Sequence, residues 1–415
     1  MVGNTYPYSI DDWFDDITLA IEHDIDGFVL NVGHEQWQKD RVSDCFQAAS
    51  RLHAEAPFSF FLSFDMSAVP SQTENDIVLL SGYLETFGLS LRMFRHHGKV
   101  MVSTFSGENG LFGQHSLELA YSFVKRTLEM VTPIHLVPSF FIDPARYPAF
   151  EALDGAFNWN GGWPLHLTSR SSRSHIENAS LDTDQYHLKN LHGRTFMAAV
   201  SPWFFTHYGP DSWNKNWIYR GDDWLFVRRW EQLIEMRDQI DFVQVISWND
   251  YGESHYIGPI KGAQPNSQAW VNGYPHTSWL VLNQYFARAF RTGKYPEIKT
   301  DRIFMWARPH AKNAIAKERV PRPEHWQLTD DVFWVVVFAA AACKVRLYSD
   351  HKHSKSFNVD AGMTRLSFPL RVGSGMRARM KRNGVVILDC HPHDFIFTNN
   401  PEVYNFNAFV TMAEN

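Results

Sequence analysis

The sequence predicts a mixed α/β fold, a (β/α)8 TIM barrel followed by a small C-terminal antiparallel β-sandwich domain. Short β-branched or aromatic runs alternate with helix-like stretches up to about Trp248, and such alternation favours parallel pairing of the strands. Eight units of this kind close a barrel. Beyond residue 297 the helical pattern stops, and strand-like runs separated by Pro and Gly turns take over. We therefore expect the barrel in residues 1–297 and the sandwich in residues 298–415.

Seven complete strand-like runs support the barrel, and each ends in a polar or Gly-containing turn. They occupy residues 27–32, 58–65, 99–105, 134–140, 155–159, 195–201 and 242–248. An eighth, shortened strand is expected in residues 1–4. A doubly wound open sheet is the alternative architecture, but no Gly-rich phosphate-binding turn follows the first strand.

Helix signals separate these runs. Ser9 and two acidic residues after it open a predicted helix over residues 13–23, where the helix dipole favours negative charge in the first turn. A second helix, over residues 224–237, also begins with two acids, and a third covers residues 278–291. The strands of the sandwich are expected at residues 301–308, 332–338, 344–347, 363–369, 384–388 and 395–397.

The composition excludes several classes of partner. The net charge is −6, whereas a nucleic-acid binder needs a basic face to displace counterions. The longest apolar run, residues 332–343, is shorter than the ~20 residues that span a bilayer and is read as a core strand. We expect a monomer with no metal or organic cofactor, no nucleic-acid partner and no membrane contact.

The three cysteines argue against a disulfide framework, because they are few, odd in number and without metal-ligand spacing. Buried free thiols are the expected state of Cys45, Cys343 and Cys390, and a Cys343–Cys390 bridge is the alternative. The N-terminal residues show neither the basic nor the apolar segment of a signal peptide. The sequence leaves the localisation open between the cytoplasm and secretion from a chain whose natural start lies upstream.

Polar and aromatic side chains gather at the predicted carboxyl ends of the barrel strands, where barrel enzymes place reactive groups. The positions are Asn31, Asp65, Glu108, Asn158, Trp159, Trp203, His207 and the block Trp248-Asn249-Asp250-Tyr251-Gly252-Glu253. Acids, amides and aromatic rings without a Lys suit a neutral, polyhydroxylated substrate rather than a phosphate. The aromatic content of 15%, with 15 Trp, fits sugar rings, which stack on aromatic faces, although most single Trp residues are structural.

Asp250 and Glu253 are the strongest catalytic candidates. Glycosidic cleavage needs one carboxylic acid to protonate the leaving oxygen and one carboxylate to act as base or nucleophile. These two residues lie three positions apart after the last predicted strand, and Gly252 gives the turn freedom to aim both inward. Asp65 could raise the pKa of a neighbour or hold a water. The structural alternatives are a helix cap near Ser67 for Asp65 and an Asx turn for Asp250.

Five segments carry a family resemblance. They are Met1-Val2-Gly3-Asn4-Thr5-Tyr6-Pro7-Tyr8, Asp26-Gly27-Phe28-Val29-Leu30-Asn31-Val32-Gly33, Ser63-Phe64-Asp65-Met66, Ser247-Trp248-Asn249-Asp250-Tyr251-Gly252-Glu253-Ser254 and Ile303-Phe304-Met305-Trp306-Ala307-Arg308-Pro309-His310. Together they resemble glycoside hydrolase family 71 over nearly the whole chain. Members of that family usually carry His-Phe before the first segment, and its absence here leaves the expected first strand incomplete.

The resemblance implies a fungal endo-α-1,3-glucanase, also called a mutanase, which acts with inversion on the α-1,3-glucan of fungal cell walls. It implies Asp250 and Glu253 as the catalytic carboxylates and Asp65 as a third essential acid. We expect Glu253 to be the general acid and Asp250 the base that activates water. Inversion predicts carboxyl groups about 6.5–9.5 Å apart, against about 5–5.5 Å for a retaining pair.

Further residues are expected to bind the substrate. The candidate sugar platforms are Trp159, Trp203, Tyr208 and Trp248; the candidate hydroxyl partners are His207 and Asn158, with Asn31 and Glu108 as additional contacts. Two other functions remain open. One is a non-catalytic α-glucan-binding protein that has lost the chemistry, and the other is a barrel glycosidase that cleaves a different α-glucan linkage, such as α-1,4.

Overall fold

The computed structural model describes residues 1–53 and 55–415. Internal contacts divide these residues into two compact units. The first unit contains residues 1–162, 181–200 and 235–245, and the second contains residues 163–180, 201–234 and 246–415. The second unit thus includes segments that the sequence analysis assigned to the barrel. The boundary expected between residues 297 and 298 stays a prediction.

The first unit contains two sheets of parallel strands. Strands β1 (Gly27–Val32), β2 (Ser59–Asp65), β4 (Lys99–Phe105) and β5 (Ile134–Leu136) pair in that order, with the short β3 (Arg95–His96) antiparallel to β4. Strands β6 (Gly155–Asn158), β7 (Thr195–Val200) and β10 (Phe242–Val245) form the second sheet. Backbone bonds from Asp154 N to the Leu136 carbonyl (3.0 Å) and from Phe157 N to the Pro138 carbonyl (2.9 Å) connect β6 to the segment of β5.

The seven complete strand predictions are confirmed as parallel strands, although β5 and β10 end earlier than expected. The predicted eighth strand is wrong, because residues 2–5 form the 3-10 helix η1 (Val2–Thr5). Thr5 Oγ1 donates to the Val2 carbonyl at 2.7 Å, so the segment satisfies its polar groups locally instead of on a neighbouring strand.

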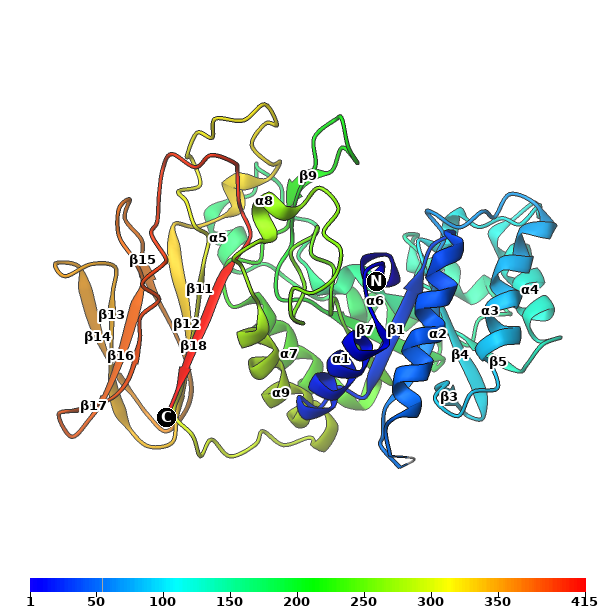
Figure 1. Cartoon of the computed structure of the whole chain (residues 1–415), viewed down its shortest axis with the longest axis horizontal. Coiled ribbons are helices and arrows are strands. Elements are labelled where there is room, and N and C mark those ends of the chain that lie inside the picture. Colours follow the sequence, from blue (N-terminus) through cyan, green and yellow to red (C-terminus); the bar gives the residue numbers. More distant parts are fainter. Residues whose placement is uncertain (54) are drawn as a thin grey trace. The chain divides into compact units, whose positions relative to one another are not determined.

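Helices of the first unit lie between these strands in the sequence. They are α1 (Ile10–Glu22), α2 (Gln36–Ser50), α3 (Ile77–Phe87), α4 (Leu117–Leu128) and α6 (Thr183–Leu191), with short 3-10 turns η2 (Glu74–Asp76), η3 (Gly107–Asn109), η4 (Pro144–Ala149), η5 (Trp159–Gly162) and η6 (Arg237–Gln239). Ser9 caps α1 in a reciprocal capping box with Asp12, as the sequence predicted. Figure 1 shows α1 beside α2 and β1.

The second unit combines a helical part with two antiparallel sheets. The helical part contains α5 (Arg173–Glu177), the hairpin of β8 (Phe205–His207) and β9 (Asn216–Ile218), α7 (Leu225–Glu235), α8 (Gln268–Val271), α9 (Thr277–Thr292) and η7 (Trp326–Leu328). Both α7 and α9 match predicted helices. No described helix is long and apolar enough to cross a bilayer.

The two antiparallel sheets have four strands each (Figure 1). One has the order β15 (Gly362–Pro369), β12 (Val332–Ala339), β11 (Arg302–Ala307) and β18 (Phe409–Glu414). The other has the order β14 (Ser354–Val359), β13 (Cys343–Tyr348), β16 (Arg377–Arg382) and β17 (Val385–Cys390). Inward-facing residues of both, including Met305, Val335, Val345 and Met380, share one apolar core, which confirms the predicted antiparallel C-terminal region.

Three strands of these sheets escaped prediction, and one predicted strand is absent. β14 and β16 carry runs of charged and polar residues, and β18 lies near the end of the chain. Residues 395–397 form no strand in the described chain, because Phe395 and Phe397 reach the core from a loop. All three cysteines are free thiols, so the Cys343–Cys390 bridge is absent; Cys45 and Cys390 are buried as expected, whereas Cys343 is only half-buried.

Candidate active site

The segment that carries the predicted catalytic acids, residues 246–258, folds back on itself; we call it the acidic loop. Ser247 N donates to the His255 carbonyl at 2.7 Å, and Ile257 N donates to the Ser247 carbonyl at 2.9 Å. These bonds pair the two arms of the loop as in a hairpin. The turn between the arms is therefore held at both ends.

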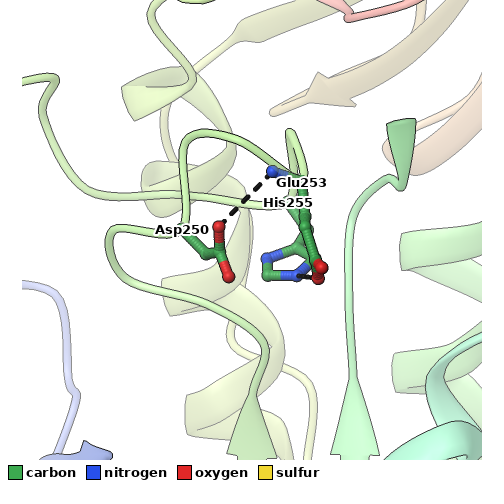
Figure 2. Close-up of side chains that lie close together, drawn as sticks. All are labelled: Asp250, Glu253 and His255. Atoms are coloured by element: carbon green, nitrogen blue, oxygen red, sulfur yellow. Dashed lines mark hydrogen bonds and ion pairs between the residues drawn. The ribbon is translucent and has the colours of Figure 1, made fainter. Parts of the chain in front are cut away.

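Side chains fix the turn from within. The Ser247 hydroxyl oxygen accepts a hydrogen bond from Asp250 N at 2.8 Å, and Asp250 Oδ1 accepts one from Glu253 N at 3.4 Å (Figure 2). The second contact is the Asx-type bond that the sequence offered as the structural role of Asp250. Asp250 thus shapes the turn and presents its carboxyl group beside Glu253.

Gly252 is required for a different reason than the one we predicted. Its φ does not lie in the left-handed region, so conformational freedom does not explain the glycine. A Cβ at this position would instead lie 2.1 Å from the Tyr208 hydroxyl oxygen. The glycine is needed because the tyrosine packs directly on the turn.

Asp250, Glu253 and His255 form one cluster (Figure 2). One oxygen of each carboxyl group and one ring nitrogen of His255 all lie within 4.8 Å of one another. His255 Nε2 is 3.1 Å from Glu253 Oε2, and His255 Nδ1 is 3.0 Å from the Ser247 hydroxyl. The imidazole is buried, with 1% of its side chain exposed, whereas 23% of the Glu253 side chain is exposed.

A lysine completes the surroundings of Glu253. Lys215, beside strand β9, places Nζ 3.5 Å from Glu253 Oε1. The residues at the predicted strand ends included no Lys, so this cation was not anticipated. The hairpin of β8 and β9 brings this cation to an acid 38 residues later in the chain, a proximity that strand-end positions alone did not reveal.

The two carboxyl groups are biased in opposite directions. Burial raises the pKa of Asp250, and the negative charge of Glu253 raises it further. Burial also acts to raise the pKa of Glu253, but the hydrogen bond and charge of His255 and the charge of Lys215 outweigh it and lower that pKa. One acid therefore favours its protonated form and its neighbour the ionised form.

This arrangement suits proton transfer. A protonated and an ionised carboxyl group side by side can donate one proton and accept another in the same reaction. Asp250, Glu253 and His255 also lie close enough to share a small cation. The pairing of Glu253 with His255 and Lys215 accounts for its charge without such an ion.

Aromatic side chains of the second unit lie next to the acidic loop. Tyr208 is buried, donates its hydroxyl hydrogen bond to the Pro265 carbonyl at 3.2 Å, and contacts Trp213 edge-on at 4.6 Å between ring centroids. Trp213 is 53% exposed. Trp248 is half-buried, and its indole packs on Gly258, where a Cβ would lie 2.7 Å from the ring. Trp213 and Trp248 thus offer accessible aromatic surface, whereas the buried Tyr208 packs against the acidic loop.

Two predicted substrate contacts of the second unit are occupied by the protein. Trp203 is 3% exposed and donates its indole N–H to the Phe406 carbonyl at 2.8 Å. His207 is buried, with Nδ1 2.7 Å from Asn216 Oδ1 and Nε2 3.0 Å from Glu318 Oε1. Because these polar groups already have partners, both side chains are explained by packing of the unit.

The remaining predicted residues belong to the first unit. Asp65, which ends β2, accepts hydrogen bonds at Oδ1 from Ser67 N (3.0 Å) and Ser67 Oγ (2.5 Å), the local contact that we offered as its structural role. Glu108 accepts from Ser106 Oγ and from Phe141 N, both at 3.0 Å. Their catalytic and binding roles stay predictions.

Three other residues lie at or near strand ends of this unit. Asn158 Nδ2 donates to Asp184 Oδ1 at 2.7 Å, and half-buried Trp159 contacts Phe105 at 4.7 Å between ring centroids. Asn31 Oδ1 is buried without a hydrogen-bond partner in the described chain. An unpaired buried carbonyl oxygen is costly, and the substrate contact expected of Asn31 stays a prediction.

Sequence reasoning missed Lys215, Ser247, His255 and Trp213 as site residues. His255 and Ser247 flank the predicted acids closely, so the expectation that each acid needs polar support could have pointed to them. Lys215 and Trp213 carried no such signal, because they depend on the hairpin of β8 and β9, which was not predicted.

Comparison with known proteins agrees with the predicted family. The family model described as glycosyl hydrolase family 71 matches residues 1–415. A glucan endo-1,3-alpha-glucosidase of Schizosaccharomyces pombe is 32% identical over 414 residues, covering 99% of this chain and 92% of that protein. An ascus wall endo-1,3-alpha-glucanase of the same yeast is 30% identical over 435 residues (99% and 95% covered). A mutanase of Penicillium rubens is 29% identical over 420 residues (99% and 86%).

Proposed function

Since this chain belongs to glycosyl hydrolase family 71 and is a glycoside hydrolase, we propose that it cleaves α-1,3-glucan at internal linkages. The names of three relatives that align over 99% of the chain support this substrate. The predicted acid block and its surroundings support hydrolysis by acid–base chemistry. We further propose that the enzyme acts as a monomer.

The opposite pKa shifts of the two neighbouring carboxyl groups are the observation that supports this proposal most directly. Asp250, whose pKa is raised, is suited to protonate the leaving glycosidic oxygen, and Glu253, whose pKa is lowered, is suited to act as the base. This exchanges the roles that we expected from the sequence. The reason is physical, since His255 and Lys215 both favour the ionised form of Glu253.

The family resemblance implies inversion at the anomeric carbon, and the distance between the two carboxyl groups bears on this implication. Oxygens of Asp250 and Glu253 lie within 4.8 Å, closer than the carboxyl separation of about 6.5–9.5 Å typical of inverting pairs. Inversion would then need either a wider pair in the substrate complex or a base elsewhere, for which Asp65 is the candidate. The anomer released first, followed by NMR, decides between inversion and retention.

We propose that the parallel strands of the first unit belong to a (β/α)8 barrel. Seven strands follow the predicted order, and the bonds between the β5 and β6 segments support continuity of the two sheets. Asn31, Asp65 and Asn158 come from the ends of three of these strands. On this proposal they contribute to the substrate site, together with Glu108, Trp159, Tyr208 and Trp248.

The test is release of reducing ends from insoluble α-1,3-glucan. Asp250→Asn and Glu253→Gln are each expected to abolish turnover, because each substitution removes a titrating group and keeps the side-chain shape. Starch is the control substrate, and hydrolysis of starch alone would favour the α-1,4 alternative. A parent protein that binds α-1,3-glucan and releases no reducing ends would instead be a glucan-binding protein, and the proposal would fail.

A further inference from the structure

We propose that His255 is a positioning residue that holds the Glu253 carboxylate ionised and correctly oriented, with Ser247 fixing the imidazole. This inference rests on the proposed function, in which Glu253 is the base. The carrying observation is that both ring nitrogens of this buried histidine are engaged, Nε2 at 3.1 Å by Glu253 Oε2 and Nδ1 at 3.0 Å by the Ser247 hydroxyl.

The position of the proton follows from these contacts. A bare Nε2 would point its lone pair at an ionised carboxylate, which is repulsive, so Nε2 must carry a proton while Glu253 is ionised. The Ser247 oxygen already accepts from Asp250 N at 2.8 Å, and its hydroxyl proton remains available for Nδ1. Ser247 therefore favours the neutral tautomer with its proton on Nε2, in which His255 donates to Glu253.

The other groups that face Glu253 do not replace this donor. Lys215 lies at 3.5 Å, and the side chain of Lys215 is 49% exposed, so water screens its charge. Tyr208 and Tyr219 feel the charge of Glu253, but burial raises the pKa of both hydroxyl groups, and they stay neutral at acidic and neutral pH. Asp250 is an acid and supplies no positive charge to its neighbour. His255 is the buried donor of the set.

Packing holds the ring in this pose. The imidazole lies against Trp163 and Phe204, with ring centroids at 5.9 and 5.8 Å. These neighbours offer no anion that would attract an imidazolium away from Glu253. The packing of His255 thus directs its Nε2 to one partner, the Glu253 carboxylate.

The test is the pH dependence of kcat/KM for His255→Ala, His255→Gln and His255→Asn. The acidic limb of the profile reports ionisation of the base. Loss of an N–H donor to a carboxylate is expected to raise that limb by about one to two pH units in the Ala variant. Gln can place an amide N–H near the Nε2 position and should restore the limb, whereas Asn carries the same amide on a shorter stem and should not.

The outcomes separate this inference from the proposed function. If Glu253→Gln is inactive while His255→Ala is folded and keeps the parental acidic limb, the positioning role is refuted and the proposed function stands. Failure of Gln to perform better than Asn also refutes it. A second readout needs no turnover: nitrogen NMR of the labelled histidine should show Nε2 protonated near neutral pH, and an unprotonated Nε2 would overturn the proposal even in an inactive protein.

A second inference concerns the basic sheet face, which we define as Lys344 and Arg346 on β13 and Arg377, Arg379 and Lys381 on β16. We infer that this face binds an anionic polysaccharide. The residues that alternate with these cations, including Val345 and Met380, are buried in the core, so the cations point to the opposite side of the sheet. The proposal is independent of the acidic loop.

The register of the two strands places like charges opposite one another. Lys344 pairs with Lys381, and Arg346 pairs with Arg379. Directly opposed like charges destabilise a sheet, so folding does not account for this arrangement. Asp389 of β17 forms ion pairs with Arg377 and Arg379 and relieves part of the repulsion.

The remaining cations have no such relief. Arg346 donates to the Ser354 hydroxyl at 2.7 Å, a neutral partner. Lys344 and Lys381 form no ion pair among the residues that the structure describes. Burial lowers the pKa of nearby His391, and His393, Arg377 and Arg379 lower it further, as a positive potential requires. On a chain of net charge −6, this is a local reversal of charge that complements an anion-bearing chain.

The partner we infer is an acidic polysaccharide rather than the neutral α-1,3-glucan, because a chain that carries negative charge complements these opposed cations. The test is electrophoresis through gels that contain polygalacturonate or neutral dextran. The parent should be retarded by polygalacturonate alone, and high salt should remove the effect. The Lys344→Ala, Arg346→Ala, Lys381→Ala triple variant should run freely, while hydrolysis of α-1,3-glucan stays unchanged.

A matched triple variant provides the control. Arg170, Lys189 and Lys294 are exposed and lie outside this sheet, and their replacement by Ala removes the same charge without changing the face. Equal loss of retardation in both triple variants would show a general charge effect and refute the proposal. Tighter binding to DNA or to anionic vesicles than to polygalacturonate would assign the face to another partner and would also refute it.

Discussion

Gly252→Ala is expected to damage both stability and catalysis, because the Tyr208 hydroxyl occupies the space that a methyl group needs. The added Cβ would lie 2.1 Å from that oxygen, whereas ordinary contact begins near 3.4 Å. The difference, 3.4 minus 2.1, requires a displacement of about 1.3 Å. Tyr208 cannot move freely, since its ring packs edge-on against Trp213 at 4.6 Å and Trp270 at 5.0 Å.

The magnitude follows from this overlap. Over-packing of a buried contact costs about 1–3 kcal/mol of the free energy of unfolding. A displacement of the turn by about 1 Å would misplace Asp250 and Glu253, and an error of that size costs roughly 100-fold in turnover. We therefore expect Gly252→Ala to lower the melting temperature and to lower kcat more than it raises KM.

The assay pairs thermal unfolding with reducing-end release and includes two further variants. Tyr208→Phe removes the clashing oxygen, after which the nearest ring carbon is 3.1 Å from the added Cβ, so the double variant should recover much of the loss that Gly252→Ala causes alone. Gly221→Ala is the control, because its Cβ would meet nothing closer than 3.5 Å. A fully active, parentally stable Gly252→Ala protein, or no recovery in the double variant, would refute the reasoning.

Three further predictions address charge and redox state. Asp250→Asn should raise the melting temperature at neutral pH. The raised pKa of Asp250 means that its ionisation destabilises the fold, so the parent loses stability as the pH rises through that pKa. The difference in melting temperature between the variant and the parent should grow over the same pH range. A gap independent of pH would contradict this. Arg220→Met should cost about 3–5 kcal/mol in chemical denaturation, because it leaves buried Asp222 and Asp330 without this partner; Lys299→Met, in an exposed pair, should change little, and equal effects would refute the argument. Thiol titration should count three free cysteines after denaturation, and a count of one would show a bridge.

The strands were predictable because their signal is local. Runs such as Gly27–Val32 and Thr195–Val200 are rich in β-branched or aromatic residues and end at turns, so their composition predicts a strand. Residues 1–4 were expected to form a shortened strand, yet residues 2–5 form η1, since a strand also needs a neighbour with which to pair. β16 is the opposite case, a strand that was not predicted. Arg377, Arg379 and Lys381 lie on its outer face, and these charged residues obscure the strand pattern of its buried inner residues.

The candidate site, like the fold, was predictable where the signal is local in the sequence. Asp250 and Glu253 were predictable because acid–base chemistry requires two carboxyl groups, and their short spacing after a strand is visible in the sequence. Their charge states were not, because the pKa of Glu253 is lowered first by the hydrogen bond and charge of His255 and then by Lys215, which reaches Glu253 from 38 residues away. The roles that we expected were assigned without these contacts, and both His255 and Lys215 favour the opposite assignment.

The acidic loop couples its fold to its chemistry. The Ser247 hydroxyl both accepts from Asp250 N and contacts His255 Nδ1, and His255 in turn contacts Glu253. A single hydroxyl group is therefore connected to the backbone of one acid and, through the imidazole, to the charge of the other. Any substitution that reshapes the turn must also alter the bias between the two carboxyl groups. Stability and pH profile should consequently change together for variants within this loop, whereas changes in the two antiparallel sheets should leave the pH profile unchanged.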